Sequence, residues 1–213
     1  MYFPAIGQVE GYWQGLFENA VIPARSAVDP RGMESALEYA FLLERIAPGV
    51  ARIRLSGMHL NDILGMDVRG MPLTALFAPA ARKDIANAIE RVCNGPRLAD
   101  LEIRSRASAG RAQLDGRLFM APLTSEDGRV TRMLACLQTQ GVIGRTPRRF
   151  DSAYCATRHL ETAASAPCHP KIRQVAFAED PAAFTASPSG APATAPAIAP
   201  AKHPHLRLVH SAD

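Results

Sequence analysis

The chain of 213 residues lacks the features that mark membrane and secreted proteins. No apolar run approaches the roughly 20 residues that a bilayer-spanning helix needs, so we expect no membrane insertion. The first ten residues have no basic stretch followed by an apolar one, which argues against a secretory signal. Four cysteines are too few for a disulfide framework in a chain of this length. We therefore expect reduced thiols and a cytoplasmic location.

Catalytic motifs are also missing. The sequence contains no Gly-x-Ser-x-Gly elbow, no His-Glu-x-x-His pair and no phosphate-binding Walker loop. His59 is the only histidine before residue 146, which leaves little material for a general base. The sequence predicts that this chain is not an enzyme.

Positive charge is present without being concentrated. The formal net charge is +4, and the excess of basic over acidic residues is small both before and after residue 145. Surfaces that bind nucleic acid gather positive charge on one face or helix. The charge pattern therefore argues against a nucleic-acid partner.

A helical pattern opens the chain. Trp13, Leu16, Phe17 and Ala20 recur at the spacing of one helical face, and Pro23 ends that pattern. Asp29 before Pro30 is a typical helix start, and apolar residues recur from there at helical spacing. We predict a second helix over about 30–47.

The period then changes to two. Ala51, Ile53 and Leu55 alternate with arginines, which predicts a strand with one buried face. Residues 58–64 are expected to form a short strand or turns. A helix over 79–92 and strands over 101–104, 113–123 and 130–139 follow.

Composition changes after about residue 145. Nine of the 17 prolines lie in 146–213, among alanine, serine and threonine. Such a segment buries too little apolar surface to offset its ordering entropy, so we predict a disordered tail. Residues 147–162 and 203–210 are candidate docking motifs within it.

One set of residues resembles the opening of a known family. The set comprises Trp13, Pro23, Arg25, Asp29, Pro30, Arg54, Gly57, Gly65 and Gly70. In order and spacing it resembles a family of short bacterial PAS-domain proteins, over roughly residues 11–140. We interpret these motif residues as structural.

The resemblance implies a fold and a function. The fold is α/β (α+β), with a PAS-like five-stranded antiparallel sheet, flanking helices, an N-terminal helical pair and a disordered C-terminal tail. Its parts are a helical extension over 1–48, a PAS-like core over 49–141 and the tail over 142–213. Similar proteins act as sensory modules in bacterial signal transduction. A homodimer and an unidentified protein partner are the implied contacts.

A PAS-type pocket would lie between the inner sheet face and the helix at 79–92. The candidate lining residues are Ile53, Leu55, Leu60, Leu64, Leu76, Phe77, Ile89, Val92, Leu101, Ile103, Leu118, Met120 and Leu134. A plain core demands the same residues, so we favour a filled core or a small apolar cavity. No cofactor is expected, although an unknown small-molecule ligand stays open.

Cofactor and metal motifs are weak. His59 is the one candidate haem ligand before the tail, and the sequence around Cys93 does not match a flavin-photoadduct motif. We interpret Cys93 and Cys136 as core residues. Cys155, His159, Cys168 and His169 have metal-like spacing, which we interpret as coincidence and not as a zinc site.

Three arginines invite structural interpretations. Arg25 is expected to pair with Asp29, and Arg52 and Arg54 with solvent or with Glu102 across the sheet. No kinase or cyclase segment follows the core, so output is expected to pass to a partner. The alternatives are a DNA-associated regulator using Arg148, Arg149 and the histidines of the tail, or a small-molecule-binding protein with an unrecognised pocket.

Overall fold

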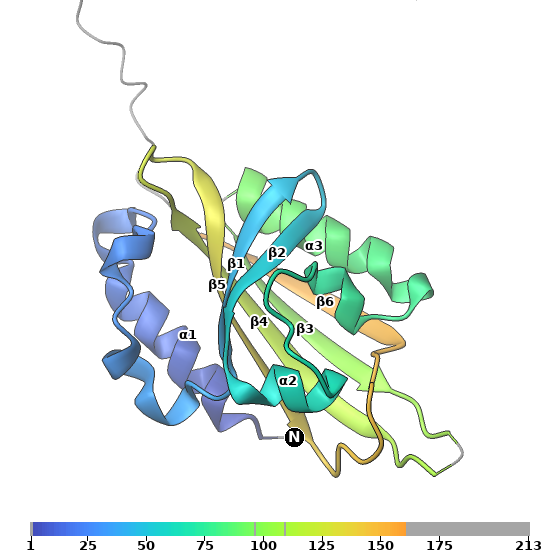
Figure 1. The fold of residues 1–213 in the computed structure, drawn as a ribbon. Coiled ribbons are helices and arrows are strands. Elements are labelled where there is room, and N and C mark those ends of the chain that lie inside the picture. Colours follow the sequence, from blue (N-terminus) through green and yellow to red (C-terminus); the bar gives the residue numbers. More distant parts are fainter. Residues whose placement is uncertain (1, 96, 109, 161–213) are drawn as a thin grey trace, which may run out of the picture. The chain divides into compact units, whose positions relative to one another are not determined.

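A computed structural model describes residues 2–95, 97–108 and 110–160. These residues form one antiparallel sheet of six strands in the order β2-β1-β5-β4-β3-β6 (Figure 1). The strands are β1 (Ala40–Ala47), β2 (Val50–Ser56), β3 (Arg97–Ser105), β4 (Leu114–Thr124), β5 (Val130–Gln140) and β6 (Ser152–His159). The first strand therefore lies inside the sheet, between β2 and β5.

Three α-helices flank the sheet within the described ranges: α1 (Pro4–Leu16), α2 (Met58–Leu64) and α3 (Arg82–Asn94). Short 3₁₀ turns over Glu18–Ala20, Arg25–Ala27, Pro30–Ala36, Leu73–Leu76 and Pro79–Ala81 connect them. None of the helices in this part of the chain is long and apolar enough to cross a membrane.

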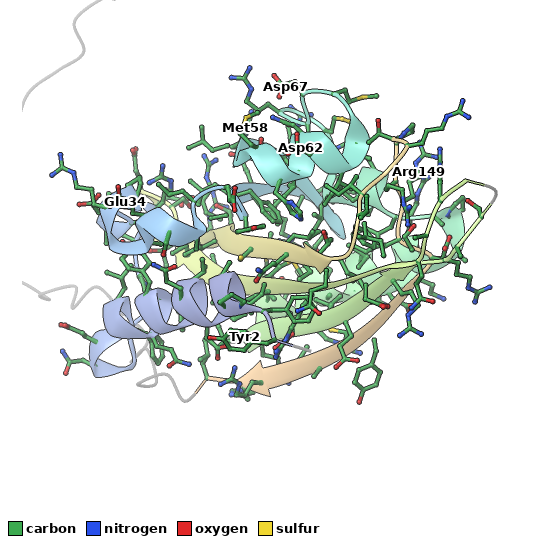
Figure 2. The ribbon with its side chains drawn as sticks, turned by 90° about the horizontal axis from the view of Figure 1, so that it is seen from below. Tyr2, Glu34, Met58, Asp62, Asp67 and Arg149 are labelled. Carbon is green, nitrogen blue, oxygen red and sulfur yellow. The ribbon has the colours of Figure 1, made fainter. Side chains whose placement is uncertain are left out.

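The sheet is covered on both faces (Figures 1 and 2). We call the face under α2 and α3 the inner face and the face under α1 the outer face. Successive strand residues point to opposite faces, so each strand feeds two cores. Leu118 and Met120 of β4 lie in the inner cluster, and Phe119 and Ala121 between and after them lie in the outer one. The predicted sheet with flanking helices is confirmed, with one strand more than expected.

The predicted helix over 30–47 is wrong. Asp29 does cap a helical turn, because its Oδ1 accepts a 3.0 Å hydrogen bond from the amide of Arg31. That turn ends at Ala36, and Ala40–Ala47 forms β1. The segment from Ala40 to Leu43 has the residues of a helix face, but pairing with β2 on one side and β5 on the other overrides that local preference.

Residues 58–64 are also not a strand or turns but helix α2. Its inward residues Leu60, Ile63 and Leu64 have helical spacing and are buried. Gly65 ends the helix at φ 72°, a left-handed conformation that glycine adopts without strain. A helix of seven residues is too short for its helical spacing of apolar residues to be recognised in the sequence.

The first predicted helix is confirmed only in part, because α1 ends at Leu16 and leaves out Phe17 and Ala20. The remaining predicted elements are confirmed. The helix over 79–92 corresponds to α3 and the 3₁₀ turn before it, and the four remaining strands correspond to β2, β3, β4 and β5. The core boundary at residue 49 was drawn too late, since β1 belongs to the sheet.

Part of the predicted tail is ordered and belongs to the sheet. Residues 152–159 form β6, which pairs with β3 along its length, from Arg104 opposite Ser152 to Arg97 opposite His159. The segment before it enters the core, since Arg148 and Phe150 are buried. The rest of the predicted tail, 161–213, lies outside the described residues, as does the candidate docking motif at 203–210.

Candidate functional site

The predicted pocket residues converge on the inner face. Eleven of the thirteen belong to one buried cluster between the sheet and helices α2 and α3: Ile53, Leu60, Leu64, Leu76, Phe77, Ile89, Val92, Leu101, Ile103, Leu118 and Met120. None of these side chains is more than 4% exposed. The topology therefore brings together the residues that would line a PAS-type pocket.

Two predicted lining residues lie elsewhere. Leu134 is buried against α1 on the outer face, because its neighbours Met133 and Ala135 take the inner positions on β5. Leu55 is 53% exposed. An irregularity in the pairing of β1 with β2 shifts the register between Leu42 and Leu43, and beyond it the alternation of β2 no longer turns Leu55 inward.

The inner cluster also contains residues that the sequence analysis missed. Phe41 and Leu43 were assigned to a helix, and Phe150 to the tail. The Phe150 ring lies 5.8 Å from that of Phe77, and its amide donates a 2.9 Å hydrogen bond to the carbonyl of Leu76. The average composition of residues 146–213 is that of a disordered segment, so it does not reveal that Phe150 is buried.

Arg148 is buried beneath the sheet, with 1% of its surface exposed. Its guanidinium donates to the carbonyl oxygens of Ala112 at 2.7 Å and Ile143 at 3.2 Å, and to the Ser105 hydroxyl at 3.3 Å. Its backbone amide donates to the carbonyl of Ile63 at 2.8 Å. These bonds hold the segment around Arg148, which precedes β6, against the core. Arg148 is therefore unavailable to an external anion.

The motif residues have structural positions. Trp13 is fully buried, and its indole Nε1 donates a 2.9 Å hydrogen bond to the carbonyl oxygen of Pro122 on β4. The Pro23 carbonyl accepts a 2.9 Å hydrogen bond from the amide of Thr124, which fixes the chain after α1 at the end of β4. Pro30 begins the turn that Asp29 caps.

Two glycines of the motif are required by the backbone, Gly57 by a close approach and Gly70 by a positive φ. A side chain at Gly57 would collide with the carbonyl oxygens of Leu37 and Glu38, and the Gly57 amide donates to the carbonyl of Ala40 at 2.9 Å. Gly70 has φ 83° and donates its amide to the carbonyl of Ile53 at 2.8 Å. That hydrogen bond holds the loop after α2 beside β2, at the edge of the sheet.

The predicted pairings of Arg25 with Asp29 and of Arg54 with Glu102 are wrong, whereas the solvent-facing position predicted for Arg54 is confirmed. Arg54 pairs with Glu44 on the neighbouring strand β1, because β2 and β3 are far apart in the sheet order. Arg25 takes part in none of the ion pairs among the described residues, and Asp29 serves as a cap.

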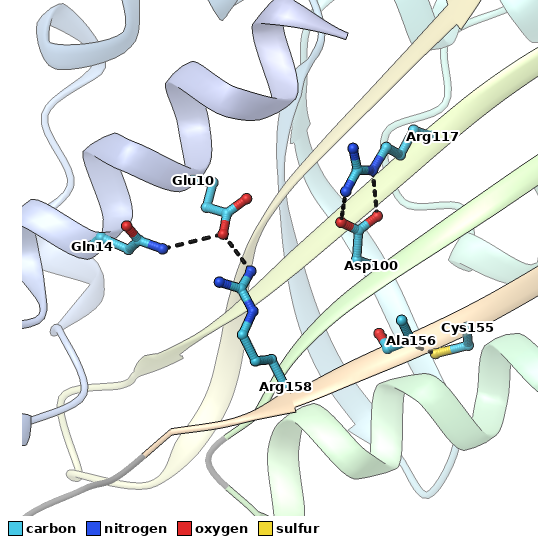
Figure 3. Close-up of polar contacts among 7 residues, drawn as sticks. All are labelled: Glu10, Gln14, Asp100, Arg117, Cys155, Ala156 and Arg158. Atoms are coloured by element: carbon cyan, nitrogen blue, oxygen red, sulfur yellow. Dashed lines mark hydrogen bonds and ion pairs between the residues drawn. The ribbon is translucent and has the colours of Figure 1, made fainter. Parts of the chain in front are cut away.

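Polar contacts join α1 to the sheet, and Figure 3 shows those around Glu10. Glu10 accepts hydrogen bonds from Gln14 of the same helix and from Arg158 of β6. Asp100 and Arg117 form an ion pair beside them between β3 and β4. At the start of the helix the Ala5 amide donates to Gln138 Oε1 at 3.1 Å.

The one histidine of the core is His59, half-buried on α2. Its Nε2 lies 3.0 Å from the Thr139 hydroxyl, and its ring meets that of Tyr39 edge-on at 4.8 Å. Burial lowers the pKa of His59 below its ordinary value, against the opposing charges of Glu38 and Asp62. These contacts give the ring a structural role in which it stays neutral.

The buried thiols of Cys93 and Cys136 are poor nucleophiles. Burial raises the pKa of Cys93 to about 11 and that of Cys136 to about 12. Cys155 and His159 lie four residues apart on β6, roughly 13 Å along a strand, too far to share one zinc ion. Within the described ranges no group of histidine, cysteine and carboxylate residues could hold a metal. Cys168 and His169 fall outside them.

No curated protein matches the chain. Among solved structures it is similar to a light-oxygen-voltage domain from work on a flavin analogue, with 16% identity, a TM-score of 0.40, and coverage of 52% of this chain and 83% of that one. The light-state LOV domain of the blue-light photoreceptor Aureochrome1 shows 14% identity, a TM-score of 0.37, and coverage of 52% and 88%. An RNA-binding light-oxygen-voltage receptor shows 18% identity and a TM-score of 0.37, and the match covers 55% of this chain and 35% of that one.

The family model described as "PAS domain" matches residues 1–138, well over half of the chain. That span runs from α1 almost to the end of β5, so it includes the helix on the outer face as well as five of the strands. The chain belongs to the PAS-domain family.

Proposed function

We propose that this PAS domain is a sensory module of signal transduction whose output is a protein contact and not a catalysed reaction, and that α1 is the element whose packing changes. The observation that carries the proposal is the composition of α1. The helix has 13 residues, and Gly7, Gly11 and Gly15 are three of them. Tertiary packing therefore has to hold a helix with little stability of its own.

The glycines are not needed for packing. A Cβ built at Gly7, Gly11 or Gly15 would meet nothing within 4 Å. Each costs the helix about 1 kcal/mol relative to alanine. A helix that spends this stability without a packing reason is suited to reversible release from the sheet.

On β4, residues that contact the outer cluster alternate with residues that point into the inner cluster. On β4, Phe119 and Ala121 touch the outer cluster that contains Trp13, whereas Leu118 and Met120 point into the inner cluster. A change of packing at the inner face moves the same strand backbones on which α1 rests. The signal is either a ligand that rearranges the inner cluster or the protein partner itself.

Two further properties belong to this proposal. We propose a homodimer, and we propose that the chain acts in the reducing cytoplasm, where its free thiols Cys93, Cys136 and Cys155 are stable. A DNA-associated role receives less support, because Arg148, one of the two adjacent arginines assigned to it, is buried.

Hydrogen exchange on the full-length protein tests the proposal. We expect the amides of α1 to exchange through a local opening, faster than those of β4 and β5. Replacing Gly7, Gly11 and Gly15 together by alanine should slow exchange in α1, and a Gly95→Ala variant, at a glycine outside α1 whose Cβ would meet only ordinary contacts, serves as the control. Equal protection of α1 and the central strands would refute α1 as the moving element.

Native mass spectrometry of the same preparation, with an absorption spectrum, separates the two signals. A bound small molecule would assign the signal to the inner cluster. A chain mass without one would assign it to a protein partner. Two chains in the complex would support the homodimer, and a monomer at micromolar concentration would refute it.

A further inference from the structure

An open groove of about 1000 Å³ lies on the outer face beside the area that α1 covers. Its floor is formed by β1, β2 and the start of β5, and its walls by residues 24–26 and the loop that joins β4 to β5. Leu42, Glu44, Arg54, Leu55 and Arg132 are among the residues that line it. We call it the arginine groove.

A bulge in β2 shapes the floor. In the pairing of β1 with β2, Leu42 faces Leu55 and Leu43 faces Ile53, so Arg54 is the extra residue. The extra residue interrupts the alternation of the strand, and Arg54 and Leu55 both line the groove. A charged and an aliphatic side chain thus lie next to each other on one exposed surface.

The charges on the floor are unbalanced. Glu44 accepts a hydrogen bond from Arg54 through Oε2 and forms an ion pair with Arg132 through Oε1 at 2.8 Å. The single negative charge of Glu44 therefore balances only one of the two guanidinium charges, and one positive charge is left over. The Glu44 side chain is 19% exposed, whereas that of Arg54 is 46% exposed and that of Arg132 34%. The positive groups therefore reach the solvent side while their shared counterion lies beneath.

Other charges at the groove do not cancel this surplus. Arg129 pairs with Asp127 within the β4–β5 loop, and Arg45 pairs with Glu90 of α3 at 2.7 Å. Arg25 adds a further cation that has no ion-pair partner among the described residues. Glu126 is the remaining carboxylate, on the exposed loop.

We propose that the arginine groove binds an extended acidic peptide segment of a partner protein, one that carries an aliphatic side chain next to a carboxylate. The carboxylate meets Arg54 and Arg132, which present planar donor pairs to it, and the aliphatic group rests on Leu42 and Leu55. A groove of this size and openness suits a peptide, because a single small anion would leave most of it unfilled. This inference rests on the proposed function in taking a protein contact as the output.

Fluorescence anisotropy with the full-length protein tests the proposal. The probe is a labelled ten-residue peptide of alternating glutamate and leucine, compared with one of alternating lysine and leucine and one of alternating glutamate and serine. We expect the first to bind and the other two to bind at least tenfold more weakly. Binding should weaken with added salt. No binding of the glutamate–leucine peptide up to about 1 mM would overturn the proposal.

Variants locate the contact. Arg54→Gln, Arg132→Gln and Leu55→Ser should each weaken binding tenfold or more, and Arg54→Lys should weaken it less than Arg54→Gln. Arg104→Gln is the matched control, since Arg104 is also an exposed strand arginine in an ion pair, with Asp115 and outside the groove. Melting curves confirm that each variant is folded. Equal affinity of Arg54→Gln and wild type would refute the groove as the binding site.

Two further readouts separate this proposal from its rivals. If sedimentation shows that Arg54→Gln abolishes self-association while peptide affinity is unchanged, the groove belongs to a second copy of the chain and the proposal is wrong. Hydrogen exchange of α1 in the same samples tests the proposed function independently. Peptide binding with a fully protected α1 would support the groove and refute only the role of α1.

Discussion

The indole Nε1 of Trp13 donates a 2.9 Å hydrogen bond to the carbonyl oxygen of Pro122, 109 positions later in the chain. Both atoms are buried between α1 and β4, where water cannot replace either partner. Pro122 faces Met133 in the ladder between β4 and β5. This single bond therefore connects α1 to the centre of the sheet.

Removing that bond should measure how firmly α1 is attached. We expect Trp13→Phe to lower the free energy of unfolding by about 1–3 kcal/mol, because it leaves the Pro122 carbonyl without a donor. Trp13→Ala should cost about 3–5 kcal/mol, since it also empties the ring's volume. Urea denaturation gives both values. Tyr2→Ala, at an exposed side chain, should change stability by less than about 0.5 kcal/mol.

Arg148 should be essential to the segment before β6. In Arg148→Ala the carbonyls of Ala112 and Ile143 lose a charged donor, and we expect a loss of about 1.5–3 kcal/mol in unfolding free energy. Arg149→Ala is the adjacent control at an exposed position and should stay within about 0.5 kcal/mol. Similar stability of the two variants would contradict the anchoring role.

Gly57 should not tolerate a side chain. Alanine there would press against the Leu37 and Glu38 carbonyls, which are backbone atoms that cannot rotate away, so we expect Gly57→Ala to destabilise by about 1–3 kcal/mol. Gly95→Ala, whose Cβ would meet only ordinary contacts, serves as the control. Thermal melting of both variants checks the difference.

His59 should make stability depend on pH. Its pKa in the folded state is below the ordinary 6.5, so the unfolded chain binds more protons between those two values. The stability that neutral His59 contributes is present above pH 6.5 and falls as the pH drops toward the folded-state pKa. Urea midpoints at pH 7.5 and 5.5 measure this loss.

Replacing the ring should isolate its share of that loss. His59→Gln can still contact the Thr139 hydroxyl but does not titrate, so its midpoint should change less between the two pH values. His159→Gln, at an exposed histidine, should behave as wild type. If wild type and His59→Gln lose equal stability, the pH dependence comes from other groups.

The sequence predicts this fold where local pattern and tertiary environment agree. Ala51 and Ile53 alternate with arginines because one face of β2 is buried. Ile85, Ala88 and Ile89 have helical spacing because one side of α3 is buried. At Phe41 and Leu43 the two disagree, since helix-forming residues are held in a strand by neighbours on both sides. Local pattern contains no information on those neighbours.

The candidate sites divide in the same way. The inner cluster follows from apolar residues on predicted elements, so eleven of its members could be named in advance. The arginine groove depends on a bulge at Arg54 and on Arg132, which comes from a strand far along the chain. The sequence pattern places Arg148 in a polar tail, because nothing local shows that its guanidinium donates to Ser105, Ile143 and Ala112.

The position of β1 between β2 and β5 has a consequence for the order of assembly. During synthesis α1 and the β1–β2 hairpin leave the ribosome first, but their partners on β4 and β5 end at Gln140. At about 5–20 residues per second, Trp13 waits roughly 6–25 s for the strands that bury it. Contacts this distant in sequence also slow folding. The newly made chain therefore exposes its largest apolar side chain for seconds, and this interval is when a chaperone would recognise it.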